Sequence, residues 1–156
     1  MFFCCSFSDT KLSDGQSIER LKKHYLDETN KYRKLHHAEN IKFCSKIEKE
    51  AQKYAIYLSK IKALKHSKTN LGENLALISV SKAKNAISLW YDEIKEYNFK
   101  NPGFNSSTGH FTQLVWKNTK KAGFGIAEND GIIYIVCQYD PPGNILDQYK
   151  ENVLDK

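Results

Sequence analysis

The chain has 156 residues, 40% of them apolar and 12% aromatic, which is enough for one domain with a buried core and excludes a disordered chain. No continuous apolar run in the sequence is long enough for a transmembrane helix. The net charge of +6 is concentrated in residues 17–68, where 14 Lys and Arg against 6 Asp and Glu give +8; a basic half of this kind suits nucleic acid, an acidic partner or an anionic membrane.

Two cysteines, Cys4 and Cys5, lie near the start of the sequence beside Phe2 and Phe3. A cysteine pair in apolar surroundings can accept palmitate, and two acyl chains anchor a domain to a membrane far better than one. The alternative is a frayed terminus with two incidental thiols, and the residues alone do not choose between them. The segment lacks the basic start and the length of a secretory signal peptide.

The other two cysteines, Cys44 and Cys137, are predicted to be buried as small hydrophobic residues. Four cysteines without a C-x-x-C pair indicate neither a disulfide framework nor a typical zinc site. This cysteine usage favours a reducing compartment, and therefore an intracellular protein.

Three helices are predicted in the first two thirds of the chain, over residues 17–36, 45–63 and 81–97. Apolar residues recur in each of them at steps of three and four, which is typical of an amphipathic helix with one buried face. The predicted buried positions are Ile18, Leu21, Tyr25, Tyr32 and Leu35 in the first helix, Ile47, Ala51, Tyr54, Ala55, Leu58 and Ile61 in the second, and Ala83, Ile87, Trp90 and Ile94 in the third.

The starts of the first two helices carry polar residues suited to capping. Ser17 is the predicted N-cap of the first helix. Ser45, followed three residues later by Glu48, has the spacing of a capping box at the start of the second. The face of the second helix opposite its apolar residues is interpreted as its solvated side. That face carries Lys46, Lys49, Lys53 and Lys60.

Three strands are predicted in the last third of the chain, over residues 111–116, 123–126 and 132–139. The last of them is a β-branched and aromatic run typical of a central strand. Residues 129–131, Asn-Asp-Gly, predict a tight hairpin turn, and residues 141–143, Pro-Pro-Gly, end the final strand. Helices followed by antiparallel strands predict an α+β domain in which helices pack on a sheet.

Two histidines and two glutamates lie in the segments that are richest in unusual polar residues. His66 precedes Glu73, and Glu93 precedes His110. Imidazole and carboxylate groups can together bind a metal or transfer protons. Their spacing matches no H-E-x-x-H, G-x-S-x-G or phosphate-loop motif, so the residues alone predict no particular chemistry.

Two longer stretches resemble the signatures of the CAP superfamily (cysteine-rich secretory, antigen 5 and pathogenesis-related proteins, which share the SCP domain). Residues 109–119, Gly-His-Phe-Thr-Gln-Leu-Val-Trp-Lys-Asn-Thr, are similar to the first signature. Residues 134–145, Tyr-Ile-Val-Cys-Gln-Tyr-Asp-Pro-Pro-Gly-Asn-Ile, are similar to the second. The resemblance covers residues 17–154, after a short N-terminal extension over 1–16, and shorter motifs resemble the Golgi-associated pathogenesis-related members of the family.

The resemblance implies a three-layer α-β-α sandwich with a central antiparallel sheet and a cleft lined by two histidines and two glutamates. By motif position these are His66, Glu73, Glu93 and His110. In family members that bind a divalent metal such as zinc the two histidines are the ligands, so His66 and His110 inherit that role. Glu73 and Glu93 would bind through water or orient the imidazoles. A site with only two protein ligands is open and weak, because structural zinc normally takes four.

The chain also departs from the family pattern. Many members have His-Asn before a Tyr-Arg pair in the first helix, whereas here Thr29 stands in the place of that histidine. Asn30 and Arg33 remain, and we expect both to be structural. The additional disulfide-forming cysteines of secreted members are missing, which again favours an intracellular protein.

The function that we predict is that of a non-catalytic CAP-domain protein, peripheral at the Golgi or another cytosolic membrane face, that binds lipid or a protein partner. Anionic lipid would meet the basic half, and the family also suggests sterol and a second copy of the chain as partners. Nucleic acid is not expected, because no recognition module matches. The alternatives are a metal-dependent peptidase or esterase that uses the same cleft, and a secreted CAP protein active in defence or host interaction.

Overall fold

A computed structural model describes residues 10–156, so the predicted acylation of Cys4 and Cys5 lies outside the described residues. The elements in chain order are α1 (Ile18–Leu35), β1 (Lys42–Phe43), α2 (Ser45–Ile61), β2 (Gly72–Ser79), the 3-10 helix η1 (Val80–Asn85), α3 (Ala86–Asp92), the 3-10 helix η2 (Glu93–Glu96), α4 (Gly109–Val115), β3 (Lys121–Asn129), β4 (Ile132–Asp140) and α5 (Tyr149–Asn152). The predicted α+β class is confirmed.

The four strands form one sheet in the order β1-β3-β4-β2. The pairs β3–β4 and β2–β4 are antiparallel, while the short edge strand β1 runs parallel to β3. The predicted turn between β3 and β4 is a tight one, and Asp130 and Gly131 there have φ of 53° and 74°. Strand β4 ends at Asp140, immediately before a cis peptide bond to Pro141.

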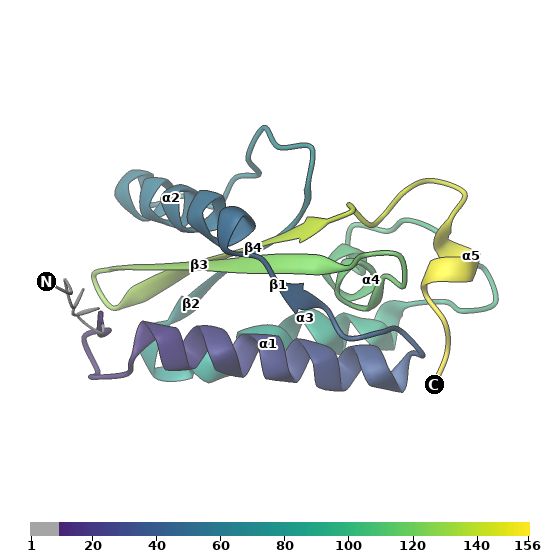
Figure 1. The fold of residues 1–156 in the computed structure, drawn as a ribbon, viewed down its shortest axis with the longest axis horizontal. Helices are drawn as coiled ribbons and strands as arrows, with labels where there is room; N and C mark the ends of the chain where they lie inside the picture. Colours follow the sequence, from purple (N-terminus) through teal and green to yellow (C-terminus); the bar gives the residue numbers. More distant parts are fainter. Residues whose placement is uncertain (1–9) are drawn as a thin grey trace, which may run out of the picture.

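Helices cover both faces of the sheet, which gives the predicted three-layer sandwich (Figure 1). Helix α2 lies alone on one face, and α1, α3 and α4 lie on the other. Each side has its own cluster of buried apolar residues. The larger cluster joins the sheet to α1, α3 and α4, and includes Tyr25, Ile87 and Phe111. It also includes Leu12, which precedes the first helix.

Helix α2 packs directly on the backbone of β3. A Cβ atom at Gly123 or Gly125 would collide with the backbone of α2 at Glu48 or Ala51. Small side chains on both elements therefore let the helix approach the strand.

The side chain of Gln52 also pairs with β3, because its Nε2 donates to the carbonyl of Ile126 at 2.8 Å and its Oε1 accepts from the Ile126 N–H at 3.1 Å. This pairing satisfies part of a strand edge that β1 is too short to cover.

The predictions for the first two helices are confirmed in extent but not in every detail. Ser17 is the N-cap of α1 and accepts a hydrogen bond from the N–H of Arg20 at 3.3 Å. Ser45 is instead the first residue inside α2, so the predicted capping box is wrong; Cys44 occupies the N-cap without a side-chain hydrogen bond. Leu35 and Ile61, predicted to be buried, are exposed at the last turns of their helices.

The third predicted helix is divided into η1, α3 and η2, of which only α3 is α-helical. Its predicted buried positions Ala83, Ile87 and Trp90 are confirmed, and Ile94 is partly buried. Of the two cysteines expected inside, Cys137 is buried and Cys44 is half-buried.

The prediction of a strand over residues 111–116 is wrong, because this segment forms the helix α4. All of its residues from Phe111 to Val115 are buried, the polar Thr112 and Gln113 included, and a segment this short that is buried on all sides does not show by periodicity whether it is a helix or a strand. Strand β2, for which the sequence predicted no element, pairs instead with β4, with Leu75 opposite Val136.

Candidate functional site

Glu93, at the start of η2, holds both the backbone and the ring of His110. Its Oε2 accepts from the backbone N–H groups of His110 and Phe111, at 2.9 and 3.0 Å. Its Oε1 lies 2.7 Å from Nδ1 of His110. These N–H groups belong to the first turn of α4, where a carboxylate is favoured by the helix dipole. Glu93 therefore caps α4 and orients the imidazole with the same side chain.

Trp90 and Asn74 also contact His110, Trp90 at its ring and Asn74 at its backbone carbonyl. The ring of Trp90 stacks on the imidazole, with 6.0 Å between ring centroids and an interplanar angle of 14°. The side-chain amide of Asn74 donates to the His110 carbonyl at 3.0 Å. The imidazole of His110, on α4, is therefore held by residues of α3 and η2, and the His110 backbone by Asn74 of β2.

Glu73, on β2, forms a second unit of the same kind with His66. Nδ1 of His66 lies 2.8 Å from Glu73 Oε1, and Ser67 donates to the carboxylate from its N–H at 2.9 Å and from its Oγ at 2.5 Å. Nε2 of Gln138 completes the set at 3.0 Å from Oε2. The side chain of Glu73 is 5% exposed while that of His66 is 66% exposed, so a buried carboxylate positions a solvent-accessible ring.

The environment of Glu73 keeps it ionised. Burial opposes the charged form, but the hydrogen bonds from Ser67 and Gln138, together with that from His66, outweigh it and hold the pKa of the Glu73 carboxyl below its ordinary value. Because an ionised carboxylate only accepts hydrogen bonds, the proton between Glu73 and His66 resides on Nδ1 of the ring.

The two units meet at one cavity of about 290 Å³. Its walls include three of the four predicted cleft residues, His66, Glu73 and His110. Glu93 is not among the lining residues and stands behind His110. The structure thus brings the predicted set together as two carboxylate–histidine pairs, Glu73–His66 and Glu93–His110.

The rest of the cavity wall was not predicted. It consists of Asn74, Phe104, Ser106, Gly109 and Asn144. Asn144 accepts from Oγ1 of Thr112 at 2.6 Å and donates to the carbonyl of Gly109 at 2.9 Å. It lies within the second signature, and its neighbour Gly109 lies in the first. The signatures were therefore a usable signal that these two segments share one site.

His66 and His110 are the residues of the cavity that could hold a divalent metal. Each ring uses Nδ1 for a carboxylate, which leaves Nε2 as the nitrogen that can bind a metal, and this is the usual arrangement of metal-ligating histidines. Over residues 10–156 there is no group of three or more His, Cys, Asp and Glu side chains placed to hold an ion. The fit is therefore to an open site that water would complete.

Asn30 and Arg33 have structural roles, as expected. The buried guanidinium of Arg33 donates to the carbonyls of Glu39, Leu114, Trp116 and Thr119 at 2.8 to 3.2 Å. Two of these carbonyls belong to the C-terminal end of α4, the helix that carries His110. Asn30 exchanges two hydrogen bonds with the backbone of Ile41. Thr29, in the place of the family's histidine, is buried.

The sequence is similar to those of several known proteins. The model of the family described as "CAP: Cysteine-rich secretory protein family" matches residues 26–139. The chain is 45% identical over 133 residues to human Golgi-associated plant pathogenesis-related protein 1, covering 80% of this chain and 86% of that protein. It is 41% identical over 106 residues to Protein PRY2 of Saccharomyces cerevisiae, covering 67% of this chain but 32% of that longer protein.

Solved structures give the same fold. A crystal structure of NaASP2 with Zn²⁺ superposes with a TM-score of 0.70 at 25% identity, covering 94% of this chain and 90% of that one. The sandwich and its order of elements are therefore shared with proteins of considerably diverged sequence.

Proposed function

The chain belongs to the cysteine-rich secretory protein (CAP) family, and we propose that within it this is a non-catalytic protein that binds the anionic surface of a membrane. The name of the human relative associates that protein with the Golgi, and we place this chain at the cytosolic face of the Golgi or another membrane. A secreted protein remains the alternative that the family description suggests. The described helices include none long and apolar enough to cross a membrane.

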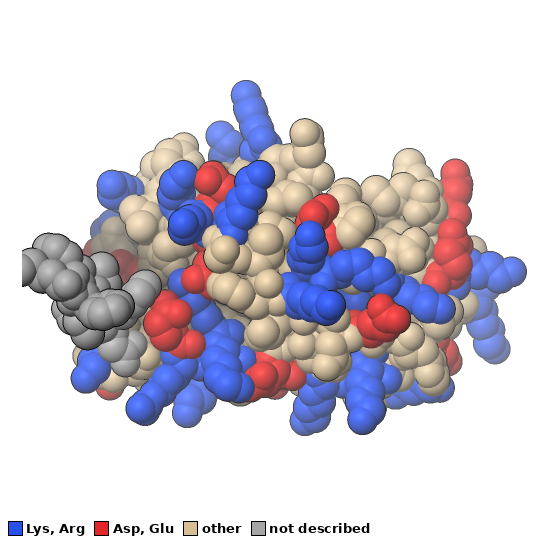
Figure 2. Space-filling view, in the orientation of Figure 1, with Lys and Arg blue, Asp and Glu red and all other residues tan. Residues whose placement is uncertain are grey.

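The observation that carries the proposal is the concentration of positive charge in the helical half. Residues 17–68 have a net charge of +8, and Figure 2 shows many Lys and Arg side chains projecting from α1 and α2 on one face of the molecule. Lys46, Lys49 and Lys60 are exposed, and no carboxylate of the described residues lies within 4.0 Å of them in an ion pair. Each lysine near an anionic leaflet contributes about 1 kcal/mol to binding.

The engagement of the cleft carboxylates supports a non-catalytic role. Glu73 accepts from Ser67, Gln138 and His66, and Glu93 accepts from both N–H groups at the start of α4 and from the ring of His110. The hydroxyl of Ser67 donates to Glu73 and not to a histidine. A general base or a nucleophile would have to give up these bonds before it met a substrate.

The cleft is proposed to hold a divalent metal such as zinc through His66 and His110, with Glu73 and Glu93 fixing the two rings. A bound metal of this kind would supply Lewis-acid polarisation and a bridge between the loop that carries His66 and α4. In this proposal the metal stabilises the cleft, because the residues that surround the metal are already engaged in hydrogen bonds.

Sedimentation with vesicles tests the membrane proposal. Phosphatidylcholine vesicles with and without phosphatidylserine are mixed with the full chain at low and at high salt. We expect binding only to the phosphatidylserine vesicles, and weaker binding as salt rises, because salt screens charge attraction. Equal binding to both vesicle types, or no binding to either, contradicts the proposal.

A further inference from the structure

The outward face of α2 has an unusual composition for a solvated helix surface. Its lysines Lys46, Lys49, Lys53 and Lys60 alternate with Ile56, Tyr57 and Ile61, and Leu64 follows just after the helix. We call this set the α2 outer face. At 100° per residue all of the helix positions except Ile61 lie on the side opposite Ala51, Ala55 and Leu58, which are fully buried against the sheet; Ile61 lies at the border of that side. Helix α2 is alone on its side of the sheet (Figure 1).

The apolar residues of the α2 outer face are substantially exposed. Ile56, Tyr57, Ile61 and Leu64 have exposed fractions of 41, 46, 41 and 47%. They gather in the last turns of the helix and just beyond it, whereas Leu35 on α1 and Leu89 on α3 stand on separate helices and a second exposed apolar pair, Ile145 and Leu146, lies in the loop before α5. Exposed apolar side chains gathered in one region mark a surface that contacts another apolar phase or partner.

The charges around this patch select the kind of partner. The lysines of the face are opposed on the same side of the helix only by Glu50, which pairs with Lys53 at 2.9 Å. Figure 2 shows Lys and Arg side chains over the region of α2 with uncharged surface between them. Apolar side chains bordered by lysines suit a membrane interface, where the apolar groups enter the headgroup region and the ammonium groups meet anionic lipid.

The start of the described chain lies at the same end of the molecule. The backbone N–H of Ser13 donates to Glu128 Oε2 at 2.7 Å, near the β3–β4 turn. The same turn is tied to the end of α2, because Asn129 donates to the Ser59 carbonyl at 2.6 Å and Lys62 pairs with Asp130 at 2.5 Å. The described chain therefore begins close to the end of α2 that carries the apolar residues.

From these four observations we infer that the α2 outer face is the surface that lies on the membrane, with Ile56, Tyr57, Ile61 and Leu64 in the headgroup region of an anionic leaflet. This inference rests on the proposed function and adds to it the orientation of the domain. The lining of the His/Glu cleft includes no residue of the α2 outer face, so the two sites can be altered separately.

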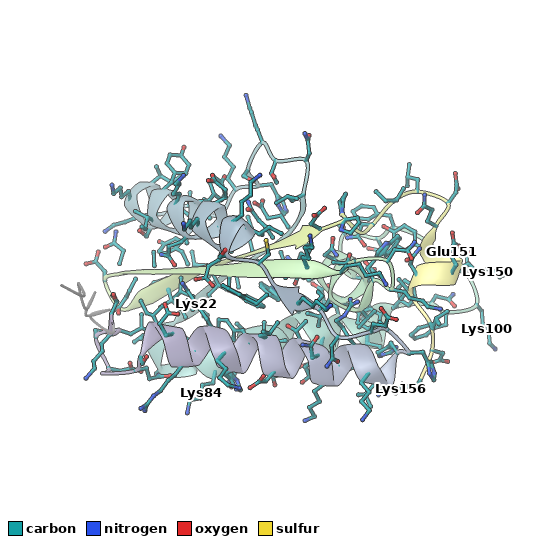
Figure 3. The ribbon with its side chains drawn as sticks, in the orientation of Figure 1. Lys22, Lys84, Lys100, Lys150, Glu151 and Lys156 are labelled. Carbon is teal, nitrogen blue, oxygen red and sulfur yellow. The ribbon has the colours of Figure 1, made fainter. Side chains whose placement is uncertain are left out.

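Two sets of lysine substitutions test whether vesicle binding depends on where the lysines lie or only on the total charge of the protein. The triple variant Lys46→Gln, Lys49→Gln, Lys60→Gln removes three charges from the α2 outer face. Its matched control, Lys34→Gln, Lys100→Gln, Lys150→Gln, removes three exposed charges elsewhere; Figure 3 shows Lys100 and Lys150 at the opposite end of the molecule from the last turn of α2. We expect the α2 variant to bind phosphatidylserine vesicles about a hundredfold more weakly, at about fivefold for each lysine, and the control to change by less than about fivefold.

The apolar contribution is tested in the same way. The double variant Ile56→Ser, Ile61→Ser should weaken vesicle binding about tenfold, while Leu35→Ser, Leu89→Ser, which removes two equally exposed leucines from α1 and α3, should leave it unchanged. These side chains are exposed, so both variants retain the core and should keep the wild-type unfolding midpoint in urea.

A fluorescence measurement reports insertion directly. The native Trp90 and Trp116 are buried, so a tryptophan introduced by Tyr57→Trp is the one that can respond to lipid. We expect its emission to shift to shorter wavelength on phosphatidylserine vesicles and to be quenched by brominated acyl chains, with no such change for Leu89→Trp.

Equal weakening of vesicle binding by the two lysine sets, together with an unchanged emission of Tyr57→Trp on vesicles, would overturn the inference and leave membrane binding by overall charge intact. Failure of the wild-type chain to bind would overturn both.

Discussion

Glu93 holds His110 at two points, its Oε2 accepting from the backbone N–H at 2.9 Å and its Oε1 meeting Nδ1 of the ring at 2.7 Å. The first contact is a helix cap and the second is the orientation of a cleft residue. Because one carboxylate makes both, the start of α4 and the direction of the imidazole cannot vary independently. The stability of α4 and the geometry of the cleft should therefore change together.

Replacing this carboxylate tests the linkage. Glu93→Gln keeps the size of the side chain but places an NH₂ group toward an N–H donor, so we expect the free energy of unfolding to fall by about 2 kcal/mol. Urea denaturation followed by circular dichroism gives the measurement. Glu96→Gln, an exposed neighbour on the same 3-10 helix, is the control and should change stability by less than about 0.5 kcal/mol. Equal effects of the two substitutions would contradict the capping role.

Metal binding is expected to depend on the same two carboxylate–histidine pairs, Glu73–His66 and Glu93–His110. Titration calorimetry with Zn²⁺ should show one site in the wild-type chain and none in the double variant His66→Ala, His110→Ala. Glu93→Gln should lower the affinity by about ten- to a hundredfold, because the ring loses the group that sets its tautomer and direction. His37→Ala, which changes an exposed histidine outside the cleft, is the control. Unchanged Zn²⁺ affinity in the double variant would exclude the cleft as the site.

Arg33 supports α4 from its other end. Its guanidinium is buried and makes four hydrogen bonds to carbonyl groups, and burial lowers its pKa to about 10, so it stays charged at neutral pH. Arg33→Lys offers donors at one nitrogen only and leaves carbonyls unpaired, so the free energy of unfolding should fall by at least about 3 kcal/mol. The exposed Arg20 provides the control, since Arg20→Lys should be nearly neutral. A loss below about 1 kcal/mol would show that water replaces these bonds.

The hydrogen bonds of Glu93 and Arg33 explain why the segment that forms α4 was predicted as a strand. The segment Phe-Thr-Gln-Leu-Val-Trp has β-branched and aromatic residues, and its local preference is for a strand. The groups that make it a helix, Glu93 and Arg33, are 17 and 81 residues away from their partners, and no local pattern contains them. Strand β2 was missed for a related reason, because its place at the edge of the sheet depends on pairing with β4, which follows much later in the chain.

The site was partly predictable. The four cleft residues were identified by motif position, and three of them line one cavity. The pairing of Glu73 with His66 and of Glu93 with His110 was not predicted, nor was the part played by Ser67 and Gln138, because hydrogen bonds between elements depend on how these pack. The amphipathic helices α1 and α2 needed no such information, since their burial follows a period that the sequence displays.

Stability should depend on pH through His36. This ring is buried, its Nδ1 donates to the Leu154 carbonyl at 2.6 Å and its Nε2 accepts from the hydroxyl of Tyr91 at 3.0 Å. Burial lowers the pKa of His36 in the folded chain, so the unfolded chain binds the proton more readily. The stabilisation is complete above the unfolded value of about 6.5 and is lost as pH falls through the lower folded value.

Urea unfolding between neutral and mildly acidic pH measures this effect. The wild-type chain should lose stability as pH falls below about 6.5, and His36→Gln, although less stable overall, should show a flatter dependence. Glu73 contributes at lower pH, since its pKa is below the ordinary value and its stabilisation is lost only as pH falls through that lowered value. His37→Gln, at an exposed neighbour, should keep the wild-type profile. A profile of His36→Gln parallel to that of the wild type would contradict the assignment.

The close packing of α2 on β3 sets the position of the α2 outer face, and a substitution at Gly125 on β3 tests this packing. A methyl group at Gly125 would meet the carbonyl of Ala51, and both groups are backbone or directly attached to it, so neither can rotate away. Gly125→Ala should therefore push α2 from the sheet and lower the free energy of unfolding by about 1–3 kcal/mol. Gly103→Ala is the matched control, because its added methyl meets nothing within 4 Å. Since α2 presents its outer face from this position, Gly125→Ala should also weaken binding to phosphatidylserine vesicles, whereas a stable variant with unchanged binding would show that the helix position is not what matters.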